Sequence, residues 1–121
     1  MNVALWVAAG VLAAAFLVAG FMKLTRRKDD LQARLPYVAG FSAAQVKAIG
    51  AIEVAAALGL ILPAVTKIAT VLVPLAATGL AITMVLATVV HLRRRESIVI
   101  NLVLLALAVF VAWGRFGAYG F

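Results

Sequence analysis

Four side chains that are ionisable or carry an amide lie in the long apolar runs of this sequence, and they are the ones that could do chemistry. They are Lys23, Glu53, His91 and Asn101. A carboxylate and an imidazole are the groups that most often transfer protons in catalysis, so Glu53 and His91 are the candidate catalytic residues. All four side chains are candidates for binding a ligand, and the reaction, if there is one, is not defined by their types.

Glu53 places the strongest constraint on the fold. Residues 48–65 are apolar apart from this carboxylate, and as a helix they would cover roughly 27 Å, close to the hydrocarbon thickness of a bilayer. A charge inside such a segment costs about 2.5–3.5 kcal/mol. Gly50, Glu53 and Ala57 share one helix face. We therefore expect Glu53 to point into a helix bundle, within reach of Lys23, His91 or Asn101.

The elements that would position these side chains are four apolar runs separated by short polar segments. The chain is 67% hydrophobic and 12% charged, whereas soluble domains average about 45–50% and 25%. Short connections favour antiparallel neighbours. The sequence therefore predicts an all-α fold, an integral membrane antiparallel four-helix bundle, with residues 1–121 as a single domain and helices near 3–24, 42–62, 67–92 and 97–114.

The second and third helices carry local signals at their ends. Ser42 and Gln45 have the spacing of a capping box, which predicts a helix beginning at this serine. Pro63 predicts that this helix ends before it. Pro74 is expected near the start of the third helix, where a missing amide costs least.

Basic residues predict the orientation. Four spans place loops 25–41 and 93–96 on one face, which holds nine basic residues: Lys23, Arg26, Arg27, Lys28, Arg34, Lys47, Arg93, Arg94 and Arg95. The opposite face holds two, Lys67 and Arg115. The positive-inside rule then places both loops in the cytoplasm and both termini outside. Trp6 and Trp113 would share the outer aromatic belt.

Composition also limits the partners and cofactors. The net charge of +7 is explained by basic loops beside membrane spans, so we expect no nucleic acid partner. The chain has no cysteine and a single histidine, which argues against disulfides, thiol redox chemistry and a metal site built by this chain alone. Membrane lipids are expected partners, and homo-oligomerisation stays open.

Each polar residue also has a purely structural interpretation. Glu53 and Lys23 could form a pair that sets the register between two helices, or they could handle protons or a ligand. Lys23 alone could extend to the headgroups. His91 could be an interfacial residue and Asn101 could bond a neighbouring helix. The arginines 93–95 are interpreted as a topology determinant that binds anionic lipid.

A ligand would occupy the cytoplasmic half of the bundle. Its polar head would lie between Lys23, Glu53, His91 and Asn101, and its tail would follow small residues, namely Gly20, Gly50 and Ala57, where helices leave most room. A purely structural pair would instead let the bundle close directly over Glu53.

Three motifs stand out along the chain: Ala19–Leu24 (AGFMKL), Gly50–Glu53 with Gly59–Pro63 (GAIE and GLILP), and Met84–His91 with Arg93 and Arg94. Together they resemble the DoxX-like family of small bacterial four-helix membrane proteins, over nearly the whole chain. The resemblance implies a multi-pass protein of the bacterial inner membrane, with Lys23, Glu53 and His91 as functional positions. Some relatives are associated with quinone-linked sulfur oxidation or with membrane oxidoreductase complexes.

Three classes of function remain open. The first is a subunit, or a quinone- or lipid-binding component, of a membrane-associated oxidoreductase system. Any redox role would come through a bound quinone, another lipophilic molecule or a partner protein. The second is a self-sufficient membrane enzyme that uses Glu53 and His91 on a lipophilic substrate. The third is a transporter or proton pathway, for which four helices without an internal repeat make alternating access difficult unless the protein oligomerises. A non-catalytic membrane scaffold ranks close behind the first class.

Overall fold

The computed structural model describes residues 1–27, 40–117 and 119–121. These residues form the helices α1 (Asn2–Thr25), α3 (Ala43–Thr66), α4 (Leu72–Arg93) and α5 (Val99–Phe116). Each helix is long and apolar enough to cross a membrane, so the predicted four-helix, all-α membrane fold is confirmed. Most of the predicted loop 25–41, including Lys28 and Arg34, lies outside the described residues.

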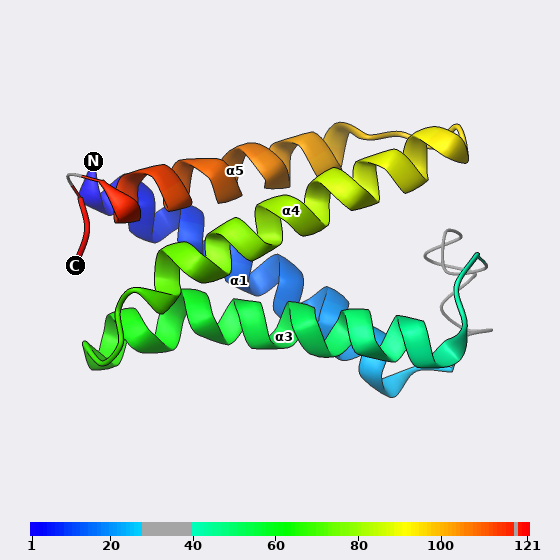
Figure 1. Cartoon of the computed structure of the whole chain (residues 1–121), viewed down its shortest axis with the longest axis horizontal. Helices are drawn as coiled ribbons and strands as arrows, with labels where there is room; N and C mark the ends of the chain where they lie inside the picture. The colour runs from blue at the N-terminus through cyan, green and yellow to red at the C-terminus, as the bar shows by residue number, and fades with distance from the viewer. Residues whose placement is uncertain (28–39, 118) are drawn as a thin grey trace.

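Successive helices run in opposite directions, and both ends of the chain lie at the same end of the bundle (Figure 1). Helix α1 packs most extensively against α3, and α4 packs against α5. Contacts between α3 and α4 and between α1 and α5 complete the bundle. The largest fully buried side chains come from all four helices: Leu5, Leu12, Leu60, Val73, Leu80 and Val111.

The outer faces of the helices are apolar as well. Phe21, Leu86 and Ile100 are 62%, 63% and 68% exposed. Large apolar side chains at this level of exposure, repeated along every helix, are unfavourable in water and favourable against lipid chains. The helices therefore present one apolar face to each other and another to the bilayer.

The start of α3 follows the predicted capping box. The backbone N–H of Gln45 donates to Ser42 Oγ at 3.1 Å, and the backbone N–H of Ser42 donates to Gln45 Oε1 at 2.9 Å. Both bonds occupy donors that the first helical turn leaves without an intrahelical partner. This cap fixes where α3 begins, and so fixes the depth of Glu53 along the helix.

The prediction that the second helix ends before Pro63 is wrong. Helix α3 continues through Pro63 to Thr66, and Lys67 in the left-handed region (φ 58°) ends it. Pro63 removes a single backbone donor, whereas ending the helix would leave several groups unpaired near lipid. Helix α4 begins at Leu72, later than predicted. Pro74 therefore lies in its first turn, where no intrahelical partner is lost.

Candidate functional site

Lys23 and Glu53 meet between α1 and α3. Lys23 lies in the last turn of α1 and Glu53 lies in the interior of α3. The Lys23 ammonium donates to Glu53 Oε1, and the two residues are only 5% and 2% exposed. The pair carries no net charge, so each group offsets much of the cost of burying the other. The structure thus selects Lys23 from the three candidate partners of Glu53.

Two glycines allow this contact. Gly20 precedes Lys23 by three residues and Gly50 precedes Glu53 by three, so each glycine lies one turn before its charged residue on the same helix face. A Cβ added at Gly20 would lie 2.6 Å from the Gly50 carbonyl oxygen, and one added at Gly50 would lie 2.8 Å from the Gly20 carbonyl oxygen. The backbones of α1 and α3 therefore approach more closely here than any side chain would permit.

The same contact overturns the expected path for a ligand tail. We predicted free space along Gly20, Gly50 and Ala57, but the backbone of the facing helix fills it at the two glycines. Ala57 is 2% exposed and belongs to the packed core. Small residues leave room for a ligand only when no other part of the protein fills that room. Here the facing helix fills the space beside Gly20 and Gly50.

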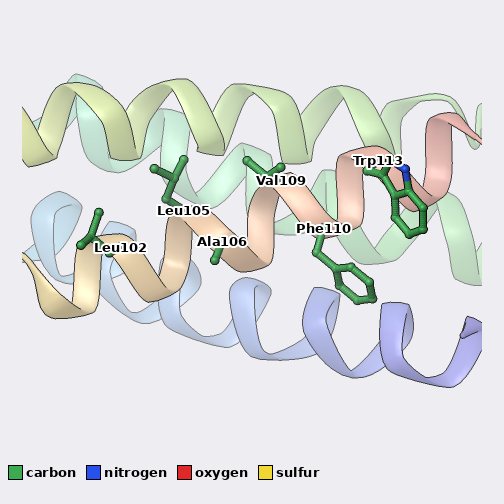
Figure 2. Close-up of a pocket in the computed structure, with 6 residues that line it drawn as sticks. All are labelled: Leu102, Leu105, Ala106, Val109, Phe110 and Trp113. Carbon is green, nitrogen blue, oxygen red and sulfur yellow. The ribbon is translucent and has the colours of Figure 1, made fainter.

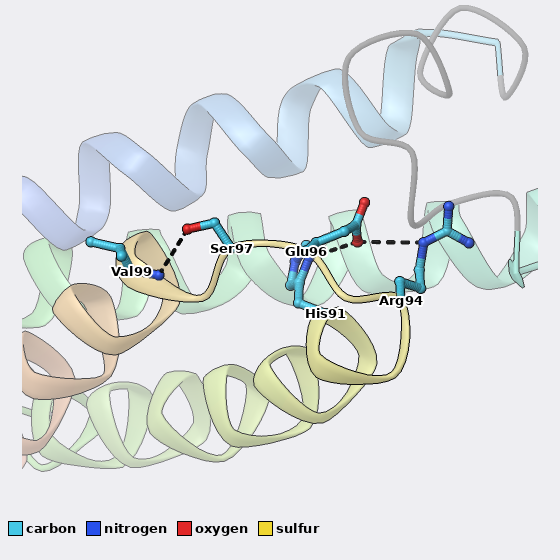
Figure 3. Close-up of polar contacts among 5 residues, drawn as sticks. All are labelled: His91, Arg94, Glu96, Ser97 and Val99. Atoms are coloured by element: carbon cyan, nitrogen blue, oxygen red, sulfur yellow. Dashed lines mark hydrogen bonds and ion pairs between the residues drawn. The ribbon is translucent and has the colours of Figure 1, made fainter.

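His91 lies apart from this pair, at the end of α4. Its Nδ1 is 3.0 Å from Glu96 Oε1, and the same oxygen is 3.4 Å from Arg94 Nε (Figure 3). Because an ionised carboxylate only accepts, the first contact places a proton on Nδ1. No hydrogen bond or ion pair joins His91 to Glu53 in the part of the chain that the structure describes.

Backbone geometry brings Glu96 to His91. Arg95 adopts a left-handed conformation (φ 57°), the Glu96 amide donates to the His91 carbonyl at 2.9 Å, and the Arg95 amide donates to the Leu92 carbonyl at 3.1 Å. This pair of bonds is a Schellman ending, which folds the chain back over the last turn. Sequence reasoning missed Glu96, because the residue at the left-handed position is an arginine and not the usual glycine.

Asn101 occupies the first turn of α5 and is 9% exposed. No hydrogen bond links its side chain to Lys23, Glu53 or His91 within residues 1–27, 40–117 and 119–121. The four predicted site residues therefore fall into one contacting pair, one separate histidine cluster and one buried amide.

Sequence reasoning also missed a cluster around Arg115, at the end of the bundle where the termini lie. Arg115 is 6% exposed, and its guanidinium donates to Asn2 Oδ1 at 2.7 Å and to the Tyr119 carbonyl at 2.9 Å. Its Cζ lies 4.1 Å from the ring centre of Phe121 and 5.8 Å from that of Trp6. This arginine fastens the segment after α5 to the start of α1 and is not a freely solvated surface charge.

Two apolar grooves lie along α5, with volumes near 460 and 470 Å³. Figure 2 shows the first groove, which is lined by Leu102, Leu105, Ala106, Val109, Phe110 and Trp113. Neither groove includes a charged side chain among its described lining residues, so they have the character of lipid-facing surface. A third pocket of about 290 Å³ includes Lys23 in its wall. It is therefore the pocket that adjoins the buried pair.

No group of three or more potential metal ligands comes together among the residues described. What the site offers is hydrogen-bond donation and positive charge from Lys23, with Glu53 as its counter-ion. Lys23 belongs both to the buried pair and to the wall of this pocket. This arrangement can hold a polar or anionic group at the end of the bundle.

The sequence model of the DoxX-like family matches residues 7–111. The match spans all of α3 and α4 and most of α1 and α5. It confirms the resemblance seen in the motifs. No match was found among curated proteins or among solved structures.

Proposed function

Since this protein belongs to the DoxX-like family, we propose that it is a non-catalytic component of a membrane-associated oxidoreductase system. In this proposal the protein binds the polar head of a lipid or a quinone, at the end of the bundle that holds Lys23. The family match and the four apolar helices establish that the chain is a small integral membrane protein. The redox association extends the family resemblance, and the experiment below tests it.

One observation carries the proposal: Lys23 contacts Glu53 and also lines the 290 Å³ pocket. The ammonium of Lys23 is a cation with three hydrogen-bond donors, and it lies in the wall of this pocket. A quinone carbonyl oxygen or a phosphate oxygen fits such a donor. A bound quinone would supply electron transfer, for which this cysteine-free chain has no thiol of its own.

The structure supports this function better than an acid–base enzyme. In such an enzyme Glu53 and His91 would act on the same substrate, but the two residues lie on different helices and have different partners. Glu53 is held between helices by Lys23 and is 2% exposed. A carboxylate that is buried and paired makes a poor general base unless the pair opens.

The experiment is purification of the full chain from its membrane in a mild detergent, followed by native mass spectrometry and quinone extraction. We expect a mass shift that matches a quinone or a lipid, and an oxidoreductase subunit among the proteins that co-purify with the chain. Lys23→Met should lose the bound species, whereas Lys67→Met, at the opposite end of the bundle, should retain it. A single ligand-free mass without a redox partner would favour a plain scaffold and contradict the proposal.

We also propose that the protein lies in the bacterial inner membrane with both termini outside. Seven described basic residues lie toward the end of the bundle opposite the termini: Lys23, Arg26, Arg27, Lys47, Arg93, Arg94 and Arg95. At the other end Arg115 is engaged in the buried cluster described above, which leaves Lys67 as an exposed cation. This asymmetry supports the orientation, because basic residues are retained on the cytoplasmic side.

A further inference from the structure

The 290 Å³ pocket lies where the end of α1 meets the beginning of α3. Its described lining contains four cationic residues and no acidic one, the full set being Lys23, Thr25, Arg26, Arg27, Ala43, Val46 and Lys47. The arrangement is non-local, because α1 and α3 contribute cations that are some twenty residues apart in sequence. It depends on the antiparallel contact that Gly20 and Gly50 allow.

The four cations differ in how far they are engaged. Lys23 contacts Glu53, and Lys47 Nζ donates to the Leu24 carbonyl at 3.0 Å, which leaves this second ammonium two further donors. Arg26 and Arg27 are exposed and form no ion pair with any described residue. Each guanidinium can offer two parallel N–H groups to a phosphate. The pocket therefore has donors directed at it from two helices.

We propose that this pocket binds the phosphate of an anionic phospholipid, an inference that rests on the lipid-binding part of the proposed function and names its ligand class. A described lining with four cations, of which Lys23 alone contacts a described carboxylate, suits an anion better than an uncharged quinone carbonyl. The volume is just below the roughly 300–1,000 Å³ of pockets that enclose a whole small molecule, and so suits a headgroup.

The depth of the pocket favours a lipid over a free anion. Lys23 lies in the last turn of an apolar helix that is long enough to cross the membrane, and Lys47 lies near the beginning of another. The end of α1 and the beginning of α3 therefore lie at headgroup level. A phosphate held there would remain attached to acyl chains that lie against the exposed apolar side chains of the bundle.

The test uses the purified full chain in mild detergent and measures binding by native mass spectrometry. The added probes are phosphatidylglycerol, phosphatidylcholine and inorganic phosphate. We expect phosphatidylglycerol to bind at least tenfold more tightly than phosphatidylcholine, with an affinity that falls as salt rises. Equal affinities for the two lipids would overturn the proposal. Displacement of phosphatidylglycerol by an equal concentration of inorganic phosphate would also overturn it, since the site would then take free anions.

A matched pair of variants separates the pocket from the general charge of this face. Arg26→Gln with Arg27→Gln should weaken phosphatidylglycerol binding at least tenfold. Arg93→Gln with Arg95→Gln removes the same charge at the same end of the bundle, but outside the described lining of the pocket. It should weaken binding at most about threefold, because these arginines attract anionic lipid only as a diffuse surface charge. Equal losses in the two double variants would show diffuse attraction and refute the site. The absence of a redox partner would refute the proposed function alone, and would leave these lipid affinities unaffected.

Discussion

The buried Lys23–Glu53 pair permits a test of how the bundle is held together. The perturbations are Glu53→Gln, which keeps the shape of the side chain and removes its charge, Lys23→Met, which keeps the length and removes the ammonium, and the double variant. Each single change leaves one partner buried without its counter-ion. The double variant leaves none.

The burial of the pair sets the expected magnitudes. The two side chains are 6% and 3% exposed, and breaking a buried pair by removing one partner costs about 3–5 kcal/mol. Glu53→Gln should cost about 3 kcal/mol, since the amide oxygen still accepts a hydrogen bond from Lys23. Lys23→Met should cost about 2 kcal/mol, because an isolated carboxyl group can become neutral by taking up a proton. The double variant should cost about 2 kcal/mol, which implies a favourable coupling of roughly 3 kcal/mol.

Reversible unfolding in mixed micelles, followed by far-ultraviolet circular dichroism, measures all four free energies of unfolding. If the single costs add to the double cost within about 0.5 kcal/mol, the two side chains do not depend on each other and the reasoning is refuted. Unchanged stability and unchanged activity of Glu53→Gln in the host complex would dismiss both the pair and a proton role.

Three further predictions follow from particular contacts. Gly50→Ala should cost about 1–3 kcal/mol of stability in the same unfolding assay, because its Cβ would meet the Gly20 carbonyl oxygen at 2.8 Å. Gly10→Ala is the control. Its added Cβ would have nothing within 4 Å, so this variant should lose no stability. Arg115→Lys should cost about 1–2 kcal/mol and increase proteolysis near the C-terminal end, because a lysine keeps the charge but loses the guanidinium fork and its ring contacts; unchanged proteolysis would contradict the fastening role. A cysteine placed at Thr66 should react with impermeant reagents only from outside the cell, and labelling only from the cytoplasmic side would reverse the proposed orientation.

Much of the fold could be predicted from the sequence, because its determinants are local. A span needs about 17–25 predominantly apolar residues, and the chain has four helices of 18 to 24 residues that meet this need. The capping box at Ser42 depends on two residues three positions apart and forms as predicted. The requirement for a partner at Glu53 is also local, since it follows from one carboxylate in an apolar helix. The end of α3 was mispredicted at Pro63, because a local cost was weighed without the larger cost of unpaired backbone in lipid.

The identity of that partner was decided only by the tertiary structure. The sequence favoured Lys23 but left His91 and Asn101 open, because helical periodicity determines which residues share a face but not how two helices slide and rotate against each other. The close approach of backbone at Gly20 and Gly50 sets that register and places the ammonium of Lys23 on the carboxylate of Glu53. The basic pocket beside Lys23 was likewise invisible in the sequence. Its cations come from the end of α1, the two residues that follow it and the beginning of α3. Their distance in space depends on packing that no local pattern records.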